Sequence, residues 1–428
     1  MILNEKQPSV TSHDSSAGSL TPADIIREAI SRPTIFKDEQ PLSLEYTPQR
    51  LPYRENQFRF LAELFRSVVN KPGTTSPRAM ITGDIGTGKT ALTRRFGTDI
   101  SRTARSLKVN LQYQHINCRE YRGSLFMILK RIVQSLSPQF PQRGFSSDEL
   151  LHALLDQLEE KNLYMILTLD EAEALIAAEG STSLYNLTRI QEERPGRQAR
   201  LSLIVILRET KKLEELDKST QSTLQRNIIR LEHYSSPQLE QILRERIDLS
   251  FKEGTVPEAL VSFIADIASN NGDARYAIEL LWRAGKYADS EESKELTPDH
   301  IRTAASSLHP VLRPEYAQYW NTHEKLIILA LARELERTGE AYATMGEVEI
   351  AYKMACEQYR EIARAHTQVW KYVQNLSATG IVSANPSTEG FRGKTTLLGL
   401  INAPAAATRQ WLESMLTATT TPTISASP

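Results

Sequence analysis

One short run, Gly83-Asp84-Ile85-Gly86-Thr87-Gly88-Lys89-Thr90, constrains the fold of this 428-residue chain more than any other feature. It matches the pattern G-x-x-x-x-G-K-[S/T], follows the β-rich run Ala79–Thr82 and precedes a helical stretch that begins near Lys89. In such a loop the glycines let backbone N–H groups surround a phosphate, the lysine neutralises phosphate charge, and the Thr90 hydroxyl is offered to Mg²⁺. The run therefore predicts a P-loop that binds ATP or ADP with Mg²⁺, with Ala91 as a further contact.

A second motif lies about 80 residues after the P-loop. The apolar run Met165–Leu169 ends in Asp170 and Glu171. At the carboxyl end of a sheet strand, Asp170 is placed to hold the Mg²⁺ shell and Glu171 to orient and activate the attacking water. An apolar strand that ends in two acids is common by itself, but its distance from a P-loop indicates a catalytic pair. The two motifs together predict ATP hydrolysis as well as binding.

Strands and helices alternate between about residues 78 and 232, which indicates βαβ units around a parallel sheet. The β-rich runs are Ala79–Thr82, Leu111–Asn117, Leu163–Leu169, Leu201–Leu207 and Ile228–Leu231. After Tyr234 the strand signal stops, and residues 236–290 and 297–308 have the periodicity of amphipathic helices. The chain therefore changes from an α/β domain to an all-helical one.

The last part of the chain has the pattern of a winged helix. Three helical segments, at about 322–337, 345–363 and 366–378, precede two short strands around a turn-rich loop. The predicted fold class is therefore α/β, with a P-loop parallel-sheet domain at 21–234, an all-helical lid domain at 235–309 and a winged-helix domain at 310–416. The polar ends, 1–20 and 417–428, cannot bury enough apolar surface to offset ordering and are predicted to be disordered.

Composition excludes several classes of protein. The chain is 40% hydrophobic and 24% charged, and no apolar run approaches the roughly 18 residues that a membrane-spanning helix needs. The polar N-terminus lacks the apolar core of a secretory signal. Cys118 and Cys356 stand alone, outside any metal-ligand spacing, which favours a reducing compartment. Since the net charge is −1, any contact with DNA must come from a local patch.

Several further segments resemble one family of P-loop proteins. Ile35–Asp38 and Tyr46–Gln57 precede the P-loop, Ile116–Arg119 follows the second strand, and Gly272-Asp273-Ala274-Arg275 opens a helix in the all-helical unit. With the P-loop, the Asp-Glu strand and the winged helix, these segments resemble the archaeal replication initiators. That family consists of AAA+ ATPases related to the eukaryotic origin recognition complex and to the cell-division-control helicase loader. The resemblance covers about residues 30–410.

The resemblance implies roles for residues around the nucleotide. The segment before the P-loop would hold the adenine base, with Tyr46, Pro48, Leu51, Pro52, Arg54 and Gln57 as contacts. The helical unit would close over the nucleotide as a lid, and Arg275 would reach the γ-phosphate. An arginine finger that acts on a neighbouring subunit is expected just before the fifth strand, where Arg226 is the best candidate and Arg230 is the alternative.

One residue departs from the family pattern. The strand next to the Asp-Glu strand usually ends in a small polar residue that positions the hydrolytic water, but here Arg208 takes that place. An arginine side chain cannot accept a hydrogen bond from water. The sequence therefore predicts slow hydrolysis unless Thr210 substitutes for the missing polar residue.

Two surfaces are candidates for DNA binding. In a winged helix the third helix enters the major groove and the wing lies along the neighbouring backbone or minor groove. The candidates are Thr367, Gln368 and Lys371 on the helix, Arg392, Gly393 and Lys394 in the wing, and Arg122, Lys130, Arg131 and Arg143 in a two-helix insertion at about 122–158. Over Tyr359–Leu416 six basic residues face three acidic ones, so positive charge is concentrated where DNA is expected. The alternative is a winged helix used for protein contacts.

Together these features predict an ATP-dependent initiator that recognises double-stranded origin DNA and helps to recruit or load the replicative helicase. Other initiator paralogues, or a second copy of the chain on DNA, are further expected partners. The expected location is the cytoplasm, associated with the nucleoid. Two alternatives remain open: an ATP-switched transcription regulator with a winged helix, and a paralogue that binds nucleotide but scarcely hydrolyses it.

Overall fold

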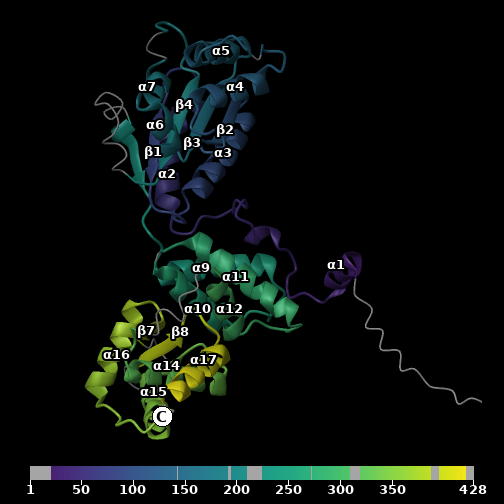
Figure 1. Cartoon of the computed structure of the whole chain (residues 1–428). Coiled ribbons are helices and arrows are strands. Elements are labelled where there is room, and N and C mark those ends of the chain that lie inside the picture. The colour runs from purple at the N-terminus through teal and green to yellow at the C-terminus, as the bar shows by residue number, and fades with distance from the viewer. Residues whose placement is uncertain are drawn as a thin grey trace, which may run out of the picture.

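Three domains follow one another along the chain in the computed structural model, and Figure 1 shows them arranged in chain order along an elongated molecule. The structure describes residues 21–141, 143–190, 194–209, 224–270, 272–308, 319–386 and 395–420. The first domain is α/β, the second is helical, and the third is a winged helix. This is the predicted fold class.

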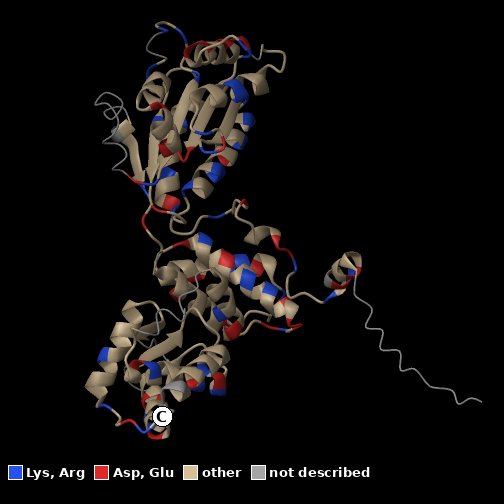
Figure 2. Cartoon of the chain, viewed as in Figure 1, with Lys and Arg blue, Asp and Glu red and all other residues tan. Residues whose placement is uncertain are grey.

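A five-stranded parallel sheet forms the centre of the first domain. Its strands are β1 (Arg78–Thr82), β2 (Leu111–Asn117), β3 (Tyr164–Asp170), β4 (Leu201–Leu207) and β5 (Ile228–Arg230), in the order β2-β3-β4-β1-β5. Each lies within one residue of its predicted bounds. Every residue of β3 and β4 is buried and the strands carry few charges (Figure 2), as expected for parallel strands covered on both faces.

Helices cover both faces of this sheet. On one face lie α2 (Glu55–Asn70) and α3 (Lys89–Ser106), whose Phe65 and Phe96 join an apolar core with β1, β3, β4 and β5. The helices of the other face are α4 (Leu125–Leu136), α5 (Ser147–Glu160), α6 (Glu173–Glu179) and α7 (Thr182–Arg189). The order of the strands places the carboxyl ends of β1, β3 and β4 side by side, so residues that follow these strands meet at one edge.

The helical domain consists of α9 (Ser236–Ser250), α10 (Glu258–Ser269), α11 (Ala274–Ser290) and α12 (Pro298–Leu308). A segment that precedes the sheet also belongs to its core: Ile35, Phe36 and Leu42 are buried there, and the rings of Phe36 and Phe251 lie 4.6 Å apart. The predicted boundary at residue 21 is therefore wrong for this segment. Helix α1 (Pro22–Ser31) and the short helix η1 (Gln40–Leu42) flank it, so the chain crosses the helical domain before it reaches the sheet.

The winged helix contains α14 (Thr322–Thr338), β6 (Ala343–Thr344), α15 (Met345–Gln358), α16 (His366–Ala378), β7 (Val382–Pro386), β8 (Thr396–Leu400) and α17 (Ala405–Thr420). The strands form a sheet in the order β6-β8-β7. Helix α15 ends five residues before its predicted end, and Arg360 after it has a left-handed φ of 57°. The predicted disordered tail at 417–428 begins too early, because α17 continues to Thr420. The predicted wing contacts Arg392, Gly393 and Lys394 lie outside the described residues.

The helical and winged-helix domains share buried contacts. Arg302 of α12 is only 1% exposed and donates hydrogen bonds to the backbone oxygens of Leu400, Glu340 and Ala341 in the winged helix. Asp266 of α10 accepts hydrogen bonds from Tyr342 at 2.6 Å and from Asn385 at 2.8 Å. Since buried polar groups of this kind are costly to separate from their partners, the two domains are held as one unit.

Candidate nucleotide and DNA sites

A cavity of about 350 Å³ lies between the α/β domain and the helical domain. Its walls come from the P-loop, the segment before α2, the ends of β3 and β4, and helices α9 and α11. The predicted residues that line it are Tyr46, Pro48, Leu51, Pro52, Ile85, Gly86, Gly88, Lys89, Thr90, Ala91, Asp170, Glu171 and Arg275. Residues far apart in the sequence are therefore brought together as a nucleotide site requires.

The P-loop turns sharply at two glycines. Gly86 and Gly88 have φ values of 74° and 91°, in the left-handed region that glycine adopts without strain. A Cβ on Gly86 would lie 1.7 Å from an oxygen of Asp273, which caps α11 of the helical domain. The backbone N–H of Ala274 also donates to the Gly86 oxygen at 3.3 Å. The helical domain thus touches the phosphate loop itself, as a lid would.

The ammonium group of Lys89 lies within the loop. It donates hydrogen bonds of 2.6 Å to the backbone oxygens of Gly83 and Asp84. Burial lowers the pKa of Lys89, although the carboxylates of Asp170 and Glu173 partly offset this effect. A cation held in a partly desolvated loop gains strongly from a phosphate, because the anion restores the interactions that burial removed.

The oxygens expected to hold Mg²⁺ lie together. The Thr90 hydroxyl donates to Oδ2 of Asp170 at 2.6 Å, and Nε2 of His115 lies 3.1 Å from the same oxygen. Burial alone would raise the pKa of Asp170, but the hydrogen bonds from His115 and Thr90 outweigh it and hold the pKa below its usual value. A hydroxyl and an ionised carboxylate are the oxygen ligands that Mg²⁺ takes beside nucleotide phosphates, so the residues present fit this ion.

His115 was not predicted, and it contacts the carboxylate of Asp170, which is expected to hold Mg²⁺. Its other ring nitrogen lies 3.3 Å from the Tyr113 hydroxyl, an arrangement in which Nε2–H donates to Asp170. We expect His115→Ala to raise the Mg²⁺ concentration needed for half-maximal ATP binding by about tenfold, because loss of such partners typically weakens metal sites 10- to 100-fold. A Mg²⁺ titration of ATP binding measures this change. His115→Gln, whose amide can donate to Asp170, should keep most of the affinity; equal loss in both variants would contradict the role.

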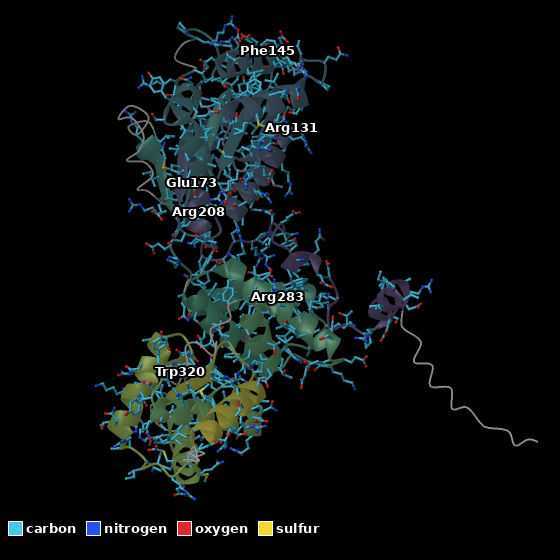
Figure 3. All side chains as sticks on the ribbon, viewed as in Figure 1. Arg131, Phe145, Glu173, Arg208, Arg283 and Trp320 are labelled. Carbon is cyan, nitrogen blue, oxygen red and sulfur yellow. The ribbon has the colours of Figure 1, made fainter. Side chains whose placement is uncertain are left out.

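Glu171 is held by two arginines. Nε of Arg119, in the turn after β2, lies 3.1 Å from one oxygen, and an Nη of Arg208, directly after β4, lies 3.1 Å from the other. Arg208 also approaches Glu173 at 3.6 Å, and Figure 3 labels both residues at the end of the sheet that faces the helical domain. Arg208 therefore lies where the sequence suggested, against the predicted catalytic glutamate. The sequence showed Arg119 only as part of a family motif. Its ion pair with Glu171 was not predicted, because the two residues meet only in the tertiary fold.

Two of the residues predicted to contact the adenine base lie outside the cavity. Among the described residues, Arg54 and Gln57 do not line it. Arg54 is 5% exposed and donates to the backbone oxygens of Thr87 and Glu232 and to the Tyr234 hydroxyl, so it ties the P-loop to the chain that enters the lid. A missed residue is Arg246 of α9, whose guanidinium lies 4.6 Å from the centre of the Tyr46 ring.

The two arginines predicted to act on the γ-phosphate occupy different positions. Arg275 lies in the first turn of α11 and lines the cavity, and its backbone N–H is capped by Asp273 at 2.8 Å. Arg226 lies in the 3-10 turn before β5 and is exposed. It is not among the described residues that line the cavity of its own chain. An action of Arg226 on a neighbouring subunit remains a prediction.

The described candidates for DNA binding lie on two surfaces. Thr367 and Lys371 are exposed on α16 and Gln368 is half-buried, whereas Val369, Val373 and Leu376 form the buried face of this helix, as predicted. Arg122 is exposed in the loop before α4, and Arg143 is exposed between α4 and α5. The structure therefore presents both sets to solvent, and their contact with DNA remains a prediction.

The geometry defines a P-loop ATPase of the AAA+ type, with a helical lid and a carboxyl-terminal winged helix. Residues 50–206 match the AAA ATPase domain, residues 240–306 the Cdc6 AAA+ ATPase-type lid domain, and residues 315–408 the CDC6 C-terminal winged helix domain. The ORC1-type DNA replication protein 2 of Sulfurisphaera tokodaii is 37% identical over 385 residues, which cover 88% of this chain and 92% of the relative. The chain belongs to the family of ORC1-type DNA replication proteins.

Other comparisons agree with this assignment. The protein of the same description from Sulfolobus acidocaldarius is 34% identical over 88% of this chain and 92% of the relative. The crystal structure of Cdc6p from Pyrobaculum aerophilum superimposes with a TM-score of 0.81 at 31% identity, covering 90% of this chain and 100% of that one. The Aeropyrum pernix ORC1 protein, solved in complex with DNA, gives a TM-score of 0.59 at 28% identity over 90% of this chain and 98% of that one. Among the described helices, none has the length and apolar character needed to cross a membrane.

Proposed function

We propose that this chain is an ATP-controlled replication initiator that binds duplex DNA at origins and helps to recruit or load the replicative helicase. The observation that carries the proposal is a lid that contacts the P-loop on one side and shares buried contacts with a winged helix on the other. The description of the relatives as DNA replication proteins supports the role, and the DNA complex of the Aeropyrum pernix protein supports duplex DNA as the partner.

The nucleotide acts first on the lid. Arg275 lines the cavity at the start of α11, and Ala274 beside it bonds the phosphate loop. A γ-phosphate within reach of Arg275 would hold α11 against the loop, and its loss would release this contact. The lid therefore has a different interaction energy with ATP than with ADP, which is the requirement for a nucleotide-driven change of shape.

The winged helix follows the lid. Arg302 bonds Leu400 at the end of β8, and Asp266 bonds Asn385 near the end of β7, so a rotation of the lid carries the wing and α16 with it. DNA that contacts both α16 and the loops around α4 would therefore be bound with different affinity in the ATP and ADP states. This arrangement supports a switch that controls how DNA is held.

Hydrolysis requires Glu171 to take a proton from water that is in line with the γ-phosphate. Lys89 and Arg275 neutralise charge on the phosphates, and Mg²⁺ held by Thr90 and Asp170 would supply further neutralisation. The ion pairs of Glu171 with Arg119 and Arg208 oppose its action as a base, because they occupy both of its carboxylate oxygens. We therefore propose slow turnover. The same observation favours the second candidate, a paralogue that binds ATP but scarcely hydrolyses it.

Replacement of Gln368 and Lys371 on α16 tests the DNA contact. We expect Gln368→Ala combined with Lys371→Ala to weaken duplex binding at least tenfold, because one base contact and one phosphate contact are lost. Fluorescence anisotropy with ATP and with ADP measures both the contact and the switch. Lys294→Ala, an exposed lysine in the link between α11 and α12, should bind as the wild type does. Unchanged affinity of the α16 variant would show that this helix faces a protein and not DNA.

A further inference from the structure

Positive charge is concentrated in one stretch of the α/β domain. Residues 91–131 contain nine Arg and Lys against two Asp and Glu, a net charge of +7, in a chain whose total is −1. The nine residues are Arg94, Arg95, Arg102, Arg105, Lys108, Arg119, Arg122, Lys130 and Arg131, and none of them is buried. The rest of the chain is therefore acidic, so this stretch differs in sign from the rest of the molecule.

The fold places this stretch along one side of the domain. It comprises most of α3, the whole of β2 and the first half of α4, and β2 is the edge strand of the sheet. Figure 2 shows basic residues along this edge from α4 to α3, and Figure 3 labels Arg131 there. Between the cations the edge strand presents Gln112 and Gln114, which carry no charge. We call Arg95, Arg102 and Arg105 of α3, together with Lys108, Lys130 and Arg131, the edge surface.

Helix α3 contributes a separate basic face to the edge surface. Its buried face contains Leu92, Phe96 and Ala104, and the opposite face carries Arg95, Arg102 and Arg105, with Lys108 two residues beyond the helix. Asp99 is the one acidic residue of the helix, and it approaches Arg95 at 2.6 Å and Arg102 at 3.5 Å. Within the described residues, neither Arg105 nor Lys108 has an ion-pair partner. The face therefore retains uncompensated positive charge.

We propose that the edge surface binds the phosphate backbone of duplex DNA, as a surface additional to α16 and the loops around α4. This inference rests on the proposed function and extends it from Lys130 and Arg131 of α4, which the sequence already suggested as DNA contacts, to α3 and Lys108. The ten helical steps from Arg95 to Arg105 rise about 15 Å, which matches about four base-pair steps of 3.4 Å. Arginine suits this partner, because its planar fork matches phosphate oxygens.

The composition of the edge surface distinguishes DNA from a protein partner. Protein interfaces are built around buried aromatic and apolar residues. Here the exposed apolar side chains are the isolated Leu107 and Met127, and no aromatic residue is exposed on α3. Contacts between arginine and phosphate carry no sequence information by themselves. The edge surface therefore holds flanking DNA, while α16 contacts base edges.

The salt dependence of DNA binding tests this surface. In the full-length protein, Arg102→Gln, Arg105→Gln and Lys108→Gln are combined, and the affinity for a long duplex is measured by anisotropy from low to moderate salt. Because each lost phosphate contact changes the slope of log K against log salt by about 0.9, the slope should become less negative by about 2 to 3. ATP binding, ATP turnover and thermal stability should stay as in the wild type. A control variant removes three charges elsewhere, with Arg27→Gln and Lys294→Gln at exposed positions and Arg283→Gln at a half-buried one, and should keep the wild-type slope.

The outcomes separate this inference from the proposed function. If the triple variant keeps the wild-type slope while Lys371→Ala weakens binding, the edge surface does not contact DNA and the inference is wrong. If light scattering gives the triple variant a different molecular mass from the wild type while its salt slope is unchanged, the edge surface contacts a second copy of the chain. That outcome would also overturn the inference. Failure of the wild type to bind duplex DNA at any salt concentration would instead contradict the proposed function itself.

Discussion

Replacing Lys89 with alanine should lower ATP affinity at least about a hundredfold, since about 3 kcal/mol is expected from two charge-assisted bonds to phosphate. The side chain is partly buried in the P-loop, where burial lowers the pKa of its ammonium group. Its removal relieves that desolvation, so thermal stability without nucleotide should not fall. The affinity is measured with a fluorescent ATP analogue. Lys71→Ala, an exposed lysine after α2, is the matched control. Wild-type affinity in the Lys89 variant would contradict the nucleotide site.

Replacing Glu171 with glutamine should lower ATP turnover about 10²- to 10⁴-fold, because a neutral amide cannot take the proton from water. ATP affinity should stay within about threefold of the wild-type value, since the substitution preserves the size and shape of the side chain. The variant should therefore accumulate in its ATP-bound state. Equal turnover by the wild type and this variant would remove Glu171 from the mechanism.

Arg208→Asn provides the complementary variant. The side chains of Arg208 and Glu171 are 36% and 27% exposed, so their ion pair is worth only about 1 kcal/mol. Release of Glu171 from that pair should raise turnover about fivefold if all of this energy opposes catalysis. Single-turnover measurement of phosphate release distinguishes faster chemistry from faster product release. Slower hydrolysis would show instead that Arg208 assists the reaction.

Sequence alone predicted the parts of the site that depend on local motifs. The P-loop and the Asp-Glu strand are continuous runs whose spacing fixes their place in a parallel sheet, and the buried strands β3 and β4 have an unmistakable apolar pattern. The winged helix followed from its order of helices and strands. These features were predictable because each residue's role is set by its neighbours in the chain.

Other parts of the site depend on contacts between distant segments. His115 bonds Asp170 across 55 positions of sequence, and Arg54 bonds Glu232 across 178. The sequence of the edge strand β2 mixes polar and apolar residues, and this pattern does not indicate that His115 will contact Asp170. Arg54 was expected to contact the base, but its side chain is buried and bonds the backbone of Thr87 and Glu232, so it ties the P-loop to the chain that enters the lid. The role of the segment around Phe36 in the lid core was missed for the same reason.

The central claim is that ATP-bound protein selects replication origins. Genome-wide footprinting of the protein in its own cells, compared with a map of replication start sites, tests it most directly. We predict a few sharp peaks at AT-rich intergenic loci that coincide with replication starts and that weaken when Lys89 is replaced by alanine. Peaks dispersed over promoters, away from the replication starts, would contradict the claim and assign the protein to transcription.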